Sequence, residues 1–246
     1  MEEIAKERMK MKYTAIIFDL DGVICHTDQY HYRAWKAVAD ELAIYFDENI
    51  NNRLRGVSRM ESFEIVLERY PGVMSEEEKV KWAEKKNAVY VGLLKNLVPA
   101  DVSREVRDTL DALKASGLKL AIGSSSKNAQ LILNQVGLLD FFDAIADGTH
   151  ISNSKPDPEV FLKAAADLSV APNDCLVVED AESGVEAAIN AGMDSAAIGD
   201  AVNCGKGTYN LEKFSDLIGI VGGLMAVICE SDRVSPKRQK RSASTN

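Results

Sequence analysis

Short, continuous runs of apolar residues recur along the chain, and such runs are typical of strands that are buried on both faces. The first run is Ala15–Phe18, and later runs cover residues 118–122, 175–178 and 195–198, with a weaker one at 142–146. Helical patterns fill the later intervals, at about 103–116, 128–136, 158–168 and 182–191. Because strands alternate with helices of this length, the pattern predicts an α/β fold, a Rossmann-like parallel sheet with helices on both faces.

Residues 27–97 break this alternation, because only helical patterns occur there. One apolar face consists of Ala34, Trp35, Val38 and Leu42, and a second of Phe63, Val66, Leu67 and Tyr70, before Pro71. Ser75 and Glu78 form a capping-box pattern that predicts the start of a third helix. The block predicts an inserted all-helical cap over the carboxyl ends of the strands, where parallel sheets bind ligands. The expected division is an α/β core of residues 13–26 and 98–230, a cap of residues 27–97 and a tail of residues 231–246.

Charge and composition narrow the class of partner. The chain has 246 residues, a net charge of −9 and 46% hydrophobic residues, as in ordinary globular proteins. The tail has a composition that predicts disorder, and without its five basic residues and one acid the body is at about −13. An acidic body disfavours nucleic acid and anionic membranes as partners, and no apolar run reaches the length of a membrane span. We therefore expect a monomer that binds a small molecule.

The cysteines and the N-terminal segment bear on the compartment. Cys25, Cys175, Cys204 and Cys229 are spread along the chain without a CxxC pair, which is typical of reduced thiols in a cytoplasmic protein. The charged N-terminal segment has no apolar centre and does not predict a secretory signal. The apolar segment Leu217–Cys229 is too short to span a bilayer, and we expect it to be a terminal element of the core.

Four polar clusters follow predicted strands or lie in loops close to them. They are Asp19–Gly22, Ser124–Asn128, Ser154–Pro158 and Glu179–Asp180. Asp19, Asp21 and Asp180 offer hard oxygen ligands that suit Mg²⁺, which lowers the repulsion between a carboxylate nucleophile and a phosphoryl group. Lys155 would neutralise the same charge, and the helix start after Ser124 would bind phosphate. One carboxylate could then attack phosphorus while a second moves a proton to or from the leaving oxygen.

The segment Phe18–Val23, together with Ser124, Lys155-Pro156 and Glu179-Asp180, resembles the four motifs of the haloacid dehalogenase superfamily, over residues 14–218. The resemblance implies that Asp19 is the nucleophile and Asp21 the general acid and base. It implies that Ser124 and Lys155 hold the transferring phosphoryl group. The implied Mg²⁺ ligands are Asp19, Asp21, Glu179 and Asp180.

The cap segments Thr27–Trp35, Arg55–Arg59 and Lys86-Asn87 resemble the β-phosphoglucomutase family within that superfamily. This resemblance implies Mg²⁺-dependent interconversion of β-D-glucose 1-phosphate and D-glucose 6-phosphate through an aspartyl-phosphate. β-D-glucose 1,6-bisphosphate would be the intermediate and the primer. The implied substrate-binding residues are Thr27, His31, Trp35, Arg55, Gly56, Val57, Arg59, Lys86, Ser125, Ser126, Lys127 and Asn128.

Some of these residues have more specific expected roles. Arg59 would clamp the phosphate that is not reacting with two hydrogen bonds, and His31 would couple cap closure to Asp21. Trp35 lies on an apolar helix face, so that both a core position and a sugar contact are open. The chain departs from the family at two places, with Arg55 where Lys is common and Ser125 where Ala is common, and either change could alter sugar preference.

The main alternative is a sugar-phosphate phosphatase of the same superfamily, in which water receives the phosphoryl group. The sequence does not separate the two, because exclusion of water depends on cap closure. A phosphonate-cleaving relative would need a Schiff-base lysine at the start of the cap, where only Lys36 lies. A dehalogenase does not need the second acid, Asp21, and a signalling receiver module has no cap.

Overall fold

Six parallel strands form a single sheet in the order β3-β2-β1-β4-β5-β6, in a computed structural model that describes residues 11–55 and 57–222. The strands are β1 (Ala15–Phe18), β2 (Lys119–Gly123), β3 (Ala144–Ala146), β4 (Cys175–Glu179), β5 (Asp194–Ala197) and β6 (Tyr209–Asn210). The predicted Rossmann-like parallel sheet is confirmed, while the two-residue strand β6 was not predicted. Its shortness explains this, because two residues give no readable hydrophobic pattern.

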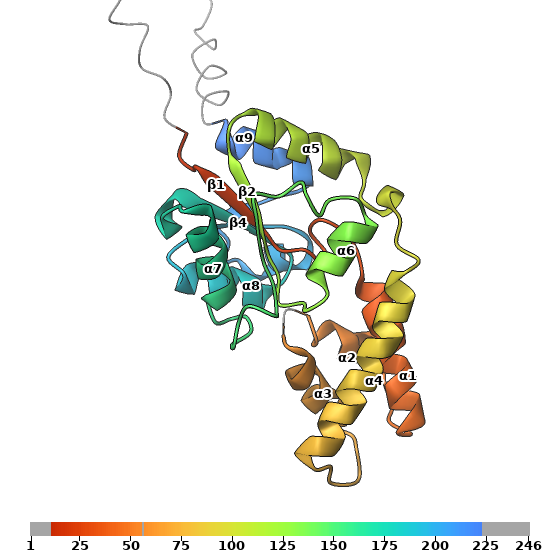
Figure 1. The fold of residues 1–246 in the computed structure, drawn as a ribbon. Helices are drawn as coiled ribbons and strands as arrows, with labels where there is room; N and C mark the ends of the chain where they lie inside the picture. The colour runs from red at the N-terminus through yellow and green to blue at the C-terminus, as the bar shows by residue number, and fades with distance from the viewer. Residues whose placement is uncertain (1–10, 56, 223–246) are drawn as a thin grey trace, which may run out of the picture.

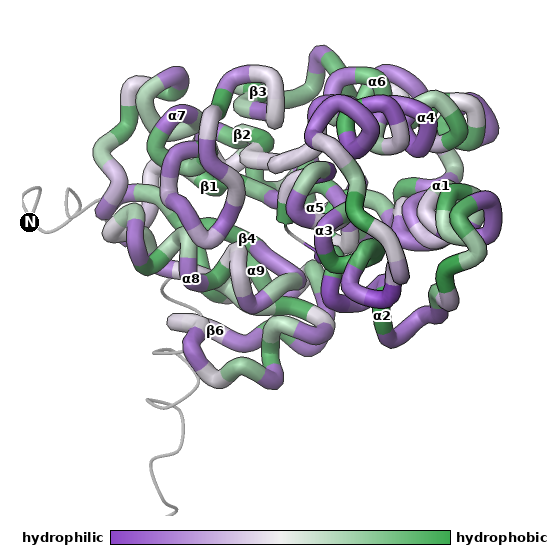
Figure 2. The backbone as a smooth tube through the Cα atoms, turned by 90° about the horizontal axis from the view of Figure 1, so that it is seen from below, coloured by the Kyte–Doolittle hydropathy of each residue, from purple (hydrophilic) through white to green (hydrophobic). Residues whose placement is uncertain are grey.

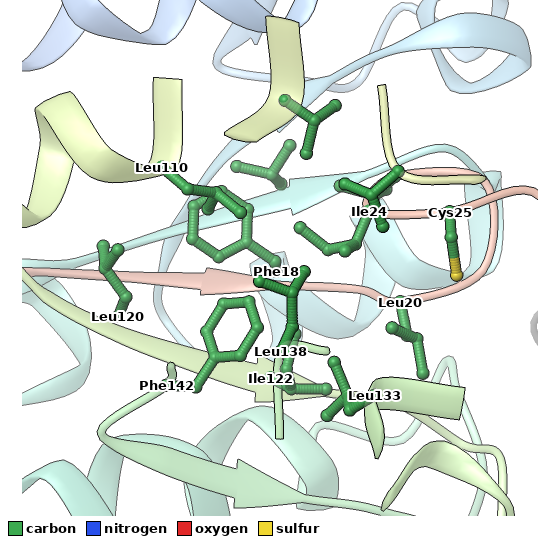
Figure 3. Packing of buried hydrophobic residues seen from close by; sticks show 14 of the residues in the cluster. Phe18, Leu20, Ile24, Cys25, Leu110, Leu120, Ile122, Leu133, Leu138 and Phe142 are labelled. Carbon is green, nitrogen blue, oxygen red and sulfur yellow. The ribbon is translucent and has the colours of Figure 1, made fainter. Parts of the chain in front are cut away.

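Helices cover both faces of the sheet (Figure 1). They are α5 (Arg104–Ala115), α6 (Ala129–Gln135), α7 (Glu159–Leu168), α8 (Glu182–Asn190) and α9 (Leu217–Val221). Side chains of β1 alternate between the faces, so that Ile16 and Phe18 pack in the cluster of α5, α6 and α9, whereas Ala15 and Ile17 pack in that of α7 and α8. Figure 3 shows the first cluster, with Phe18 at its centre.

Four helices lie between β1 and α5 in the sequence and beside the sheet in space (Figure 1). They are α1 (Asp28–Glu41), α2 (Glu48–Asn52), α3 (Arg59–Leu67) and α4 (Glu76–Leu94). These helices, which we call the cap helices, bury their own apolar cluster around Trp35 and Phe63, whose rings stack at 5.7 Å. The tube in Figure 2 alternates between hydrophilic and hydrophobic segments along the cap helices, as expected of helices with one buried face.

Two sequence signals at the cap helices had different outcomes. The capping box of α4 is confirmed, because Ser75 Oγ accepts from the N–H of Glu78 at 3.3 Å and Glu78 accepts from the N–H of Ser75 at 2.8 Å. The predicted apolar face ending at Tyr70 is wrong at its end. Helix α3 stops at Leu67, and Tyr70 lies in the following turn, where its N–H donates to the carbonyl of Leu67.

Parts of the sequence-based division lie outside the described residues, among them 223–230 of the expected core and the whole tail, 231–246. In the described residues, no helix combines the length and the apolar character that crossing a membrane requires. The sheet positions the site, because its strand order reverses beside β1, and the ends of β1, β2 and β4 then meet at one edge.

Candidate active site

The floor of the site is a buried group of charged side chains at the carboxyl ends of β1 and β4. Asp19 follows β1 directly, and its N–H donates to the carbonyl of Val178 at 3.0 Å, which extends the strand pairing by one residue. Lys155, only 2% exposed, donates to Asp19 Oδ1 and, at 2.5 Å, to Glu179 Oε1. One lysine thus connects the first and the fourth of the predicted motifs.

Burial and nearby charge set the protonation of this group. Burial raises the pKa of Asp19 to about 7; Lys155 opposes the rise, and Glu179 and Asp21 add to it. Burial lowers the pKa of Lys155, but Asp19 and Glu179 outweigh burial and hold that pKa above its ordinary value. Because one lysine faces two carboxylates, an incoming phosphate needs a further cation at this floor.

Asp180 lies against the turn that carries Asp21. Gly22 in that turn has a φ of +88°, and a Cβ there would lie 2.0 Å from Asp180 Oδ2. Glycine is therefore required at this position, both for the conformation and for the close approach. Burial, followed by the charges of Glu179 and Asp19, raises the pKa of Asp180 to about 9.

These carboxylates fit Mg²⁺, because they offer the hard oxygen atoms that this ion prefers. Both oxygens of Glu179 are engaged, one by Lys155 and the other by the N–H of Ala181 at 3.0 Å. Within residues 11–55 and 57–222, no three His, Cys, Asp or Glu side chains form a cluster that could hold a metal ion. Asp19, Asp21, Glu179 and Asp180 nevertheless lie together at this site, and their role as the Mg²⁺ ligand set stays a prediction. Mg²⁺ is commonly held by one or two carboxylates together with water and substrate phosphate, and a cation would offset the burial and the mutual repulsion that raise the pKa values of Asp19 and Asp180.

Asp21 lies at the junction between β1 and the cap helices. Burial raises its pKa to about 6, and a hydrogen bond from Thr27 opposes the rise. A carboxyl group with this pKa can both donate and accept a proton near neutral pH. The predicted substrate contact of Thr27 is wrong, because its side chain is fully buried and accepts a bond at 3.2 Å from Tyr90. Thr27 holds Asp21 in place instead.

The loop after β2 carries the serine-rich cluster. Two internal bonds fold it, from the N–H of Ser126 to Ser124 Oγ at 3.1 Å and from the N–H of Asn128 to Ser126 Oγ at 3.2 Å. Asn128 Nδ2 also donates to Asn87 Oδ1 of helix α4 at 2.9 Å, so that this loop touches the cap helices. Ser125 Oγ is buried and has no hydrogen-bond partner among the described residues, which leaves it open to a ligand.

Lys86 of α4 forms the wall opposite the floor. It is 3% exposed and contacts His31 Nδ1 at 2.9 Å, and its ammonium lies over the rings of Trp35 and Tyr90. Burial, helped by the charge of Arg59, lowers the pKa of Lys86 to about 7, although Asp21 opposes this. Burial also holds the pKa of His31 well below its ordinary value, so that its neutral ring accepts a bond from Lys86.

The other cap residues divide into several groups. Arg59 lines the cavity, and burial lowers its pKa. Val57 also lines the cavity, whereas Gly56 lies outside the described residues.

Trp35 reaches the cavity wall, but it is 1% exposed and stacked on Phe63, so that it supports Lys86 and offers no open ring to a sugar. Arg55 is engaged in ion pairs with Asp28 and Asp200, which the sequence did not predict.

A cavity of about 580 Å³ lies between the floor and the cap helices, within the usual range for small-molecule sites. It brings together most of the predicted site residues: Asp19, Asp21, His31, Trp35, Arg55, Val57, Arg59, Lys86, Ser124, Ser125, Ser126, Lys127, Asn128, Glu179 and Asp180. Sequence reasoning missed Asn51 and Ser62, two buried polar residues that also line it. The available signal was a polar residue on the buried face of a helix, and Asn51 Oδ1 has no partner among the described residues.

Comparison with known proteins agrees with this geometry. The family model described as haloacid dehalogenase-like hydrolase matches residues 16–198. A β-phosphoglucomutase of Bacillus subtilis is 43% identical over 75% of this chain and 83% of its own length. A phosphorylated carbohydrates phosphatase of Thermotoga maritima is 33% identical over 73% of this chain and 82% of its own length. The crystal structure of a β-phosphoglucomutase from Clostridium difficile matches with a TM-score of 0.79 at 39% identity, over 89% of this chain and 96% of that one.

Proposed function

The chain belongs to the haloacid dehalogenase-like hydrolases, and we propose that within this family it interconverts β-D-glucose 1-phosphate and D-glucose 6-phosphate. The observation that carries the proposal is a cavity with phosphate-binding groups on both walls. Asp19 and Ser124 line the floor, and Arg59 and Lys86 line the opposite wall. A bisphosphate intermediate needs two phosphate sites, whereas hydrolysis of a monophosphate needs one. The 43% identical β-phosphoglucomutase supports the same reaction.

Asp19 and Asp21 carry the chemistry in this proposal. A carboxylate oxygen of Asp19 attacks phosphorus, the bond from phosphorus to the sugar oxygen breaks, and Asp21 gives that oxygen a proton. In the second half of the cycle, Asp21 removes the proton from the sugar hydroxyl that attacks the aspartyl-phosphate. The proton that Asp21 gives is thus regained, and the pKa of about 6 suits both directions. β-D-glucose 1,6-bisphosphate is the intermediate and serves as the primer.

The remaining floor residues stabilise the transferring group. Ser124 donates to the phosphoryl oxygens, and Lys155 balances the charge of Asp19. Asp19, Asp21, Glu179 and Asp180 would hold Mg²⁺, which family membership implies and which would supply positive charge against the phosphoryl oxygens. These residues are held rigidly by burial and by close packing, so that little reorganisation is needed in the reaction.

The cap wall and the serine-rich loop bind the rest of the sugar phosphate. Arg59 takes the phosphate that is not reacting through two parallel hydrogen bonds. Lys127 and Asn128 reach the same region from the core, and Lys86 with His31 faces the sugar. Ser126, Val57 and Arg55 complete the lining. Gly56, which the sequence adds to this set, stays a prediction.

Partners and compartment follow from the same features. We propose a cytoplasmic monomer with a sugar phosphate as its only ligand besides Mg²⁺ and the primer, and with no role for nucleic acid or membranes. The free thiols of Cys25, Cys175 and Cys204 among the described residues support a reducing compartment.

The experiment is a coupled assay on β-D-glucose 1-phosphate with Mg²⁺ and the bisphosphate primer, beside the α anomer. We expect glucose 6-phosphate to form from the β anomer, with little free phosphate. Release of free phosphate at the same rate as glucose 6-phosphate would overturn the mutase in favour of the phosphatase, the activity after which the 33% identical relative is named.

A further inference from the structure

Arg55 reaches from the cap helices to the core and pairs with two carboxylates at once. Its Nη1 lies 2.8 Å from Asp200 Oδ2, and its Nη2 lies 2.9 Å from Asp28 Oδ2. Asp28 begins helix α1, at the junction of cap and core, whereas Asp200 belongs to the 3₁₀ helix Gly199–Cys204 that follows β5. One guanidinium therefore connects the loop before α3, the start of α1 and the 3₁₀ helix after β5.

The same 3₁₀ helix is hydrogen-bonded to Asp180, which is one of the predicted Mg²⁺ ligands. The N–H of Ala201 donates to the backbone carbonyl of Asp180 at 3.0 Å, one residue after Asp200. The guanidinium of Arg55 also lies 3.9 Å from Asp180 Oδ2, which is too long for a hydrogen bond. The hydrogen bonds of Arg55 therefore go to Asp28 and Asp200, although its guanidinium lies near Asp180, the predicted metal ligand.

We propose that Asp200 is a positioning residue, which acts through Arg55 to latch the cap helices onto the core over the phosphorylated Asp19. The inference rests on the proposed function, because its purpose is to keep water from the aspartyl-phosphate. The latch also restrains Arg55 from pairing with Asp180. Asp200 touches neither the substrate nor the reacting atoms in this scheme.

The forked side chain of arginine is what makes the latch possible. Two terminal nitrogens in a fixed plane can each hold a different carboxylate, whereas a lysine presents a single point charge. Arg55, at a position where the resembling family commonly has lysine, therefore has its partner in Asp200, 145 positions later in the chain.

Because Asp200 is exposed, replacing it should not disturb the packing of the core. Its side chain is 73% exposed, so that its removal leaves no cavity and no buried unpaired charge on the core. Exposed ion pairs are weak, so we expect effects of about two- to five-fold. Such a change is small for catalysis, but it is measurable as a ratio of two products.

The test compares Asp200→Asn, Arg55→Gln and the double variant in full-length protein, with Mg²⁺ and primer. The readout is the ratio of free phosphate to glucose 6-phosphate formed from β-D-glucose 1-phosphate. We expect Asp200→Asn to raise this ratio about two- to five-fold, and the double variant to equal Arg55→Gln. The matched control is Asp140→Asn, which removes the same charge from an exposed core aspartate that makes no ion pair with the cap among the described residues. A ratio for Asp200→Asn equal to that of Asp140→Asn would overturn the latch, as would effects that multiply in the double variant.

A second readout separates this inference from the proposed function. The unaltered protein, Asp200→Asn, Arg55→Gln and the double variant are unfolded in urea, and the coupling between Arg55 and Asp200 is taken from this double-mutant cycle. Coupling without any mutase activity would mean that the pair exists but the proposed function is wrong. Normal mutase activity without coupling would overturn the latch and leave the proposed function intact. Added salt should raise the phosphate ratio of the unaltered protein and leave that of Asp200→Asn unchanged, because salt screens an exposed ion pair.

Discussion

Two buried lysines differ in their surroundings: Lys86 lines the cavity on the cap side, and Lys155 lies on the core side against Asp19 and Glu179, which line the cavity. Lys155 on the core wall is paired with the carboxylates of Asp19 and Glu179, which hold its pKa above the ordinary value. Lys86 on the cap wall has aromatic rings and the neutral ring of His31 around it, with no ion pair among the described residues, and its pKa falls to about 7. The core wall thus holds a charge that is already balanced, and the cap wall holds one that is not.

The difference assigns a structural role to Lys155 and a ligand-binding role to Lys86. A balanced buried charge is part of the fold, because removing it leaves its partners buried and unpaired. An unbalanced buried charge destabilises the free protein and gains its partner only when an anion binds. We infer that the core wall carries the chemistry and that the cap wall recognises the sugar phosphate.

The largest effect is expected on the core wall, from Asp19→Ala. Without the nucleophile no aspartyl-phosphate forms, and turnover should fall by at least about three orders of magnitude. Phosphoenzyme is measured by mass spectrometry after a brief reaction with the bisphosphate, alongside steady-state turnover. Retained turnover in this variant would remove Asp19 as the nucleophile.

The matched control is Asp21→Asn, which keeps the shape of the second carboxylate and removes its proton transfer. Turnover should fall by about 10²–10⁴-fold, while Mg²⁺ binding is preserved.

On the cap side, Lys86→Met should raise KM more than it lowers kcat. Equal losses in kcat for Asp19→Ala and Lys86→Met would contradict the division into chemistry and recognition.

The core wall was the more predictable of the two from the sequence. Asp19 and Asp180 follow buried strands directly, and the parallel sheet brings their ends together whatever the rest of the chain does. The contact between Glu179 and Lys155 shows the limit of this reasoning. Successive residues at a strand end point to opposite sides, so the place of Glu179 beside Asp180 did not predict that it pairs with Lys155.

The contacts of the cap wall could not be predicted from local sequence patterns. The pairing of Arg55 with Asp200 depends on how the cap helices sit against the core, which no hydrophobic period encodes. The signal at Asn51 was ambiguous because its neighbours Asn49 and Asn52 are also polar, and only the packing of α2 decides which of them is buried. Thr27 was misassigned for the same reason, since its role is set by Tyr90 from a distant helix.

Replacing the two lysines should have different effects on the stability of the fold. Lys155→Met leaves Asp19 and Glu179 buried without their cation, and we expect a loss of about 3–5 kcal/mol in the free energy of unfolding. At pH 8, Lys86 is neutral in the folded protein, since its pKa there is about 7, but charged in the unfolded chain. Folding must therefore remove a proton, and Lys86→Met relieves this cost. Urea unfolding at pH 8 should find Lys86→Met at least as stable as the unaltered protein, and a larger loss for Lys86→Met than for Lys155→Met would reverse the comparison.

The smallest effect concerns the proton of Lys86 during binding. An anion beside the lysine favours its charged form, so that binding raises the pKa from about 7. Above pH 7 the free protein has a neutral Lys86, and binding must then take up a proton; below pH 7 the proton is already present. Affinity for a sugar phosphate should therefore fall as pH rises from 7 to 9, by up to about tenfold per unit.

The measurement uses the Asp19→Ala variant, so that the bound sugar phosphate is not turned over, and calorimetry in two buffers of different ionisation enthalpy. The phosphate of the ligand loses its second proton near pH 6, so it contributes little to uptake above pH 7. Asp180 and other core groups also respond to binding, and the same titration with Lys86→Met added subtracts their contribution. The difference between the two variants should approach one proton at pH 8 to 9 and vanish below pH 6. If the uptake is the same with and without Lys86, then the unbalanced charge of the cap wall is not what the anion meets, and recognition has to be sought at Arg59 instead.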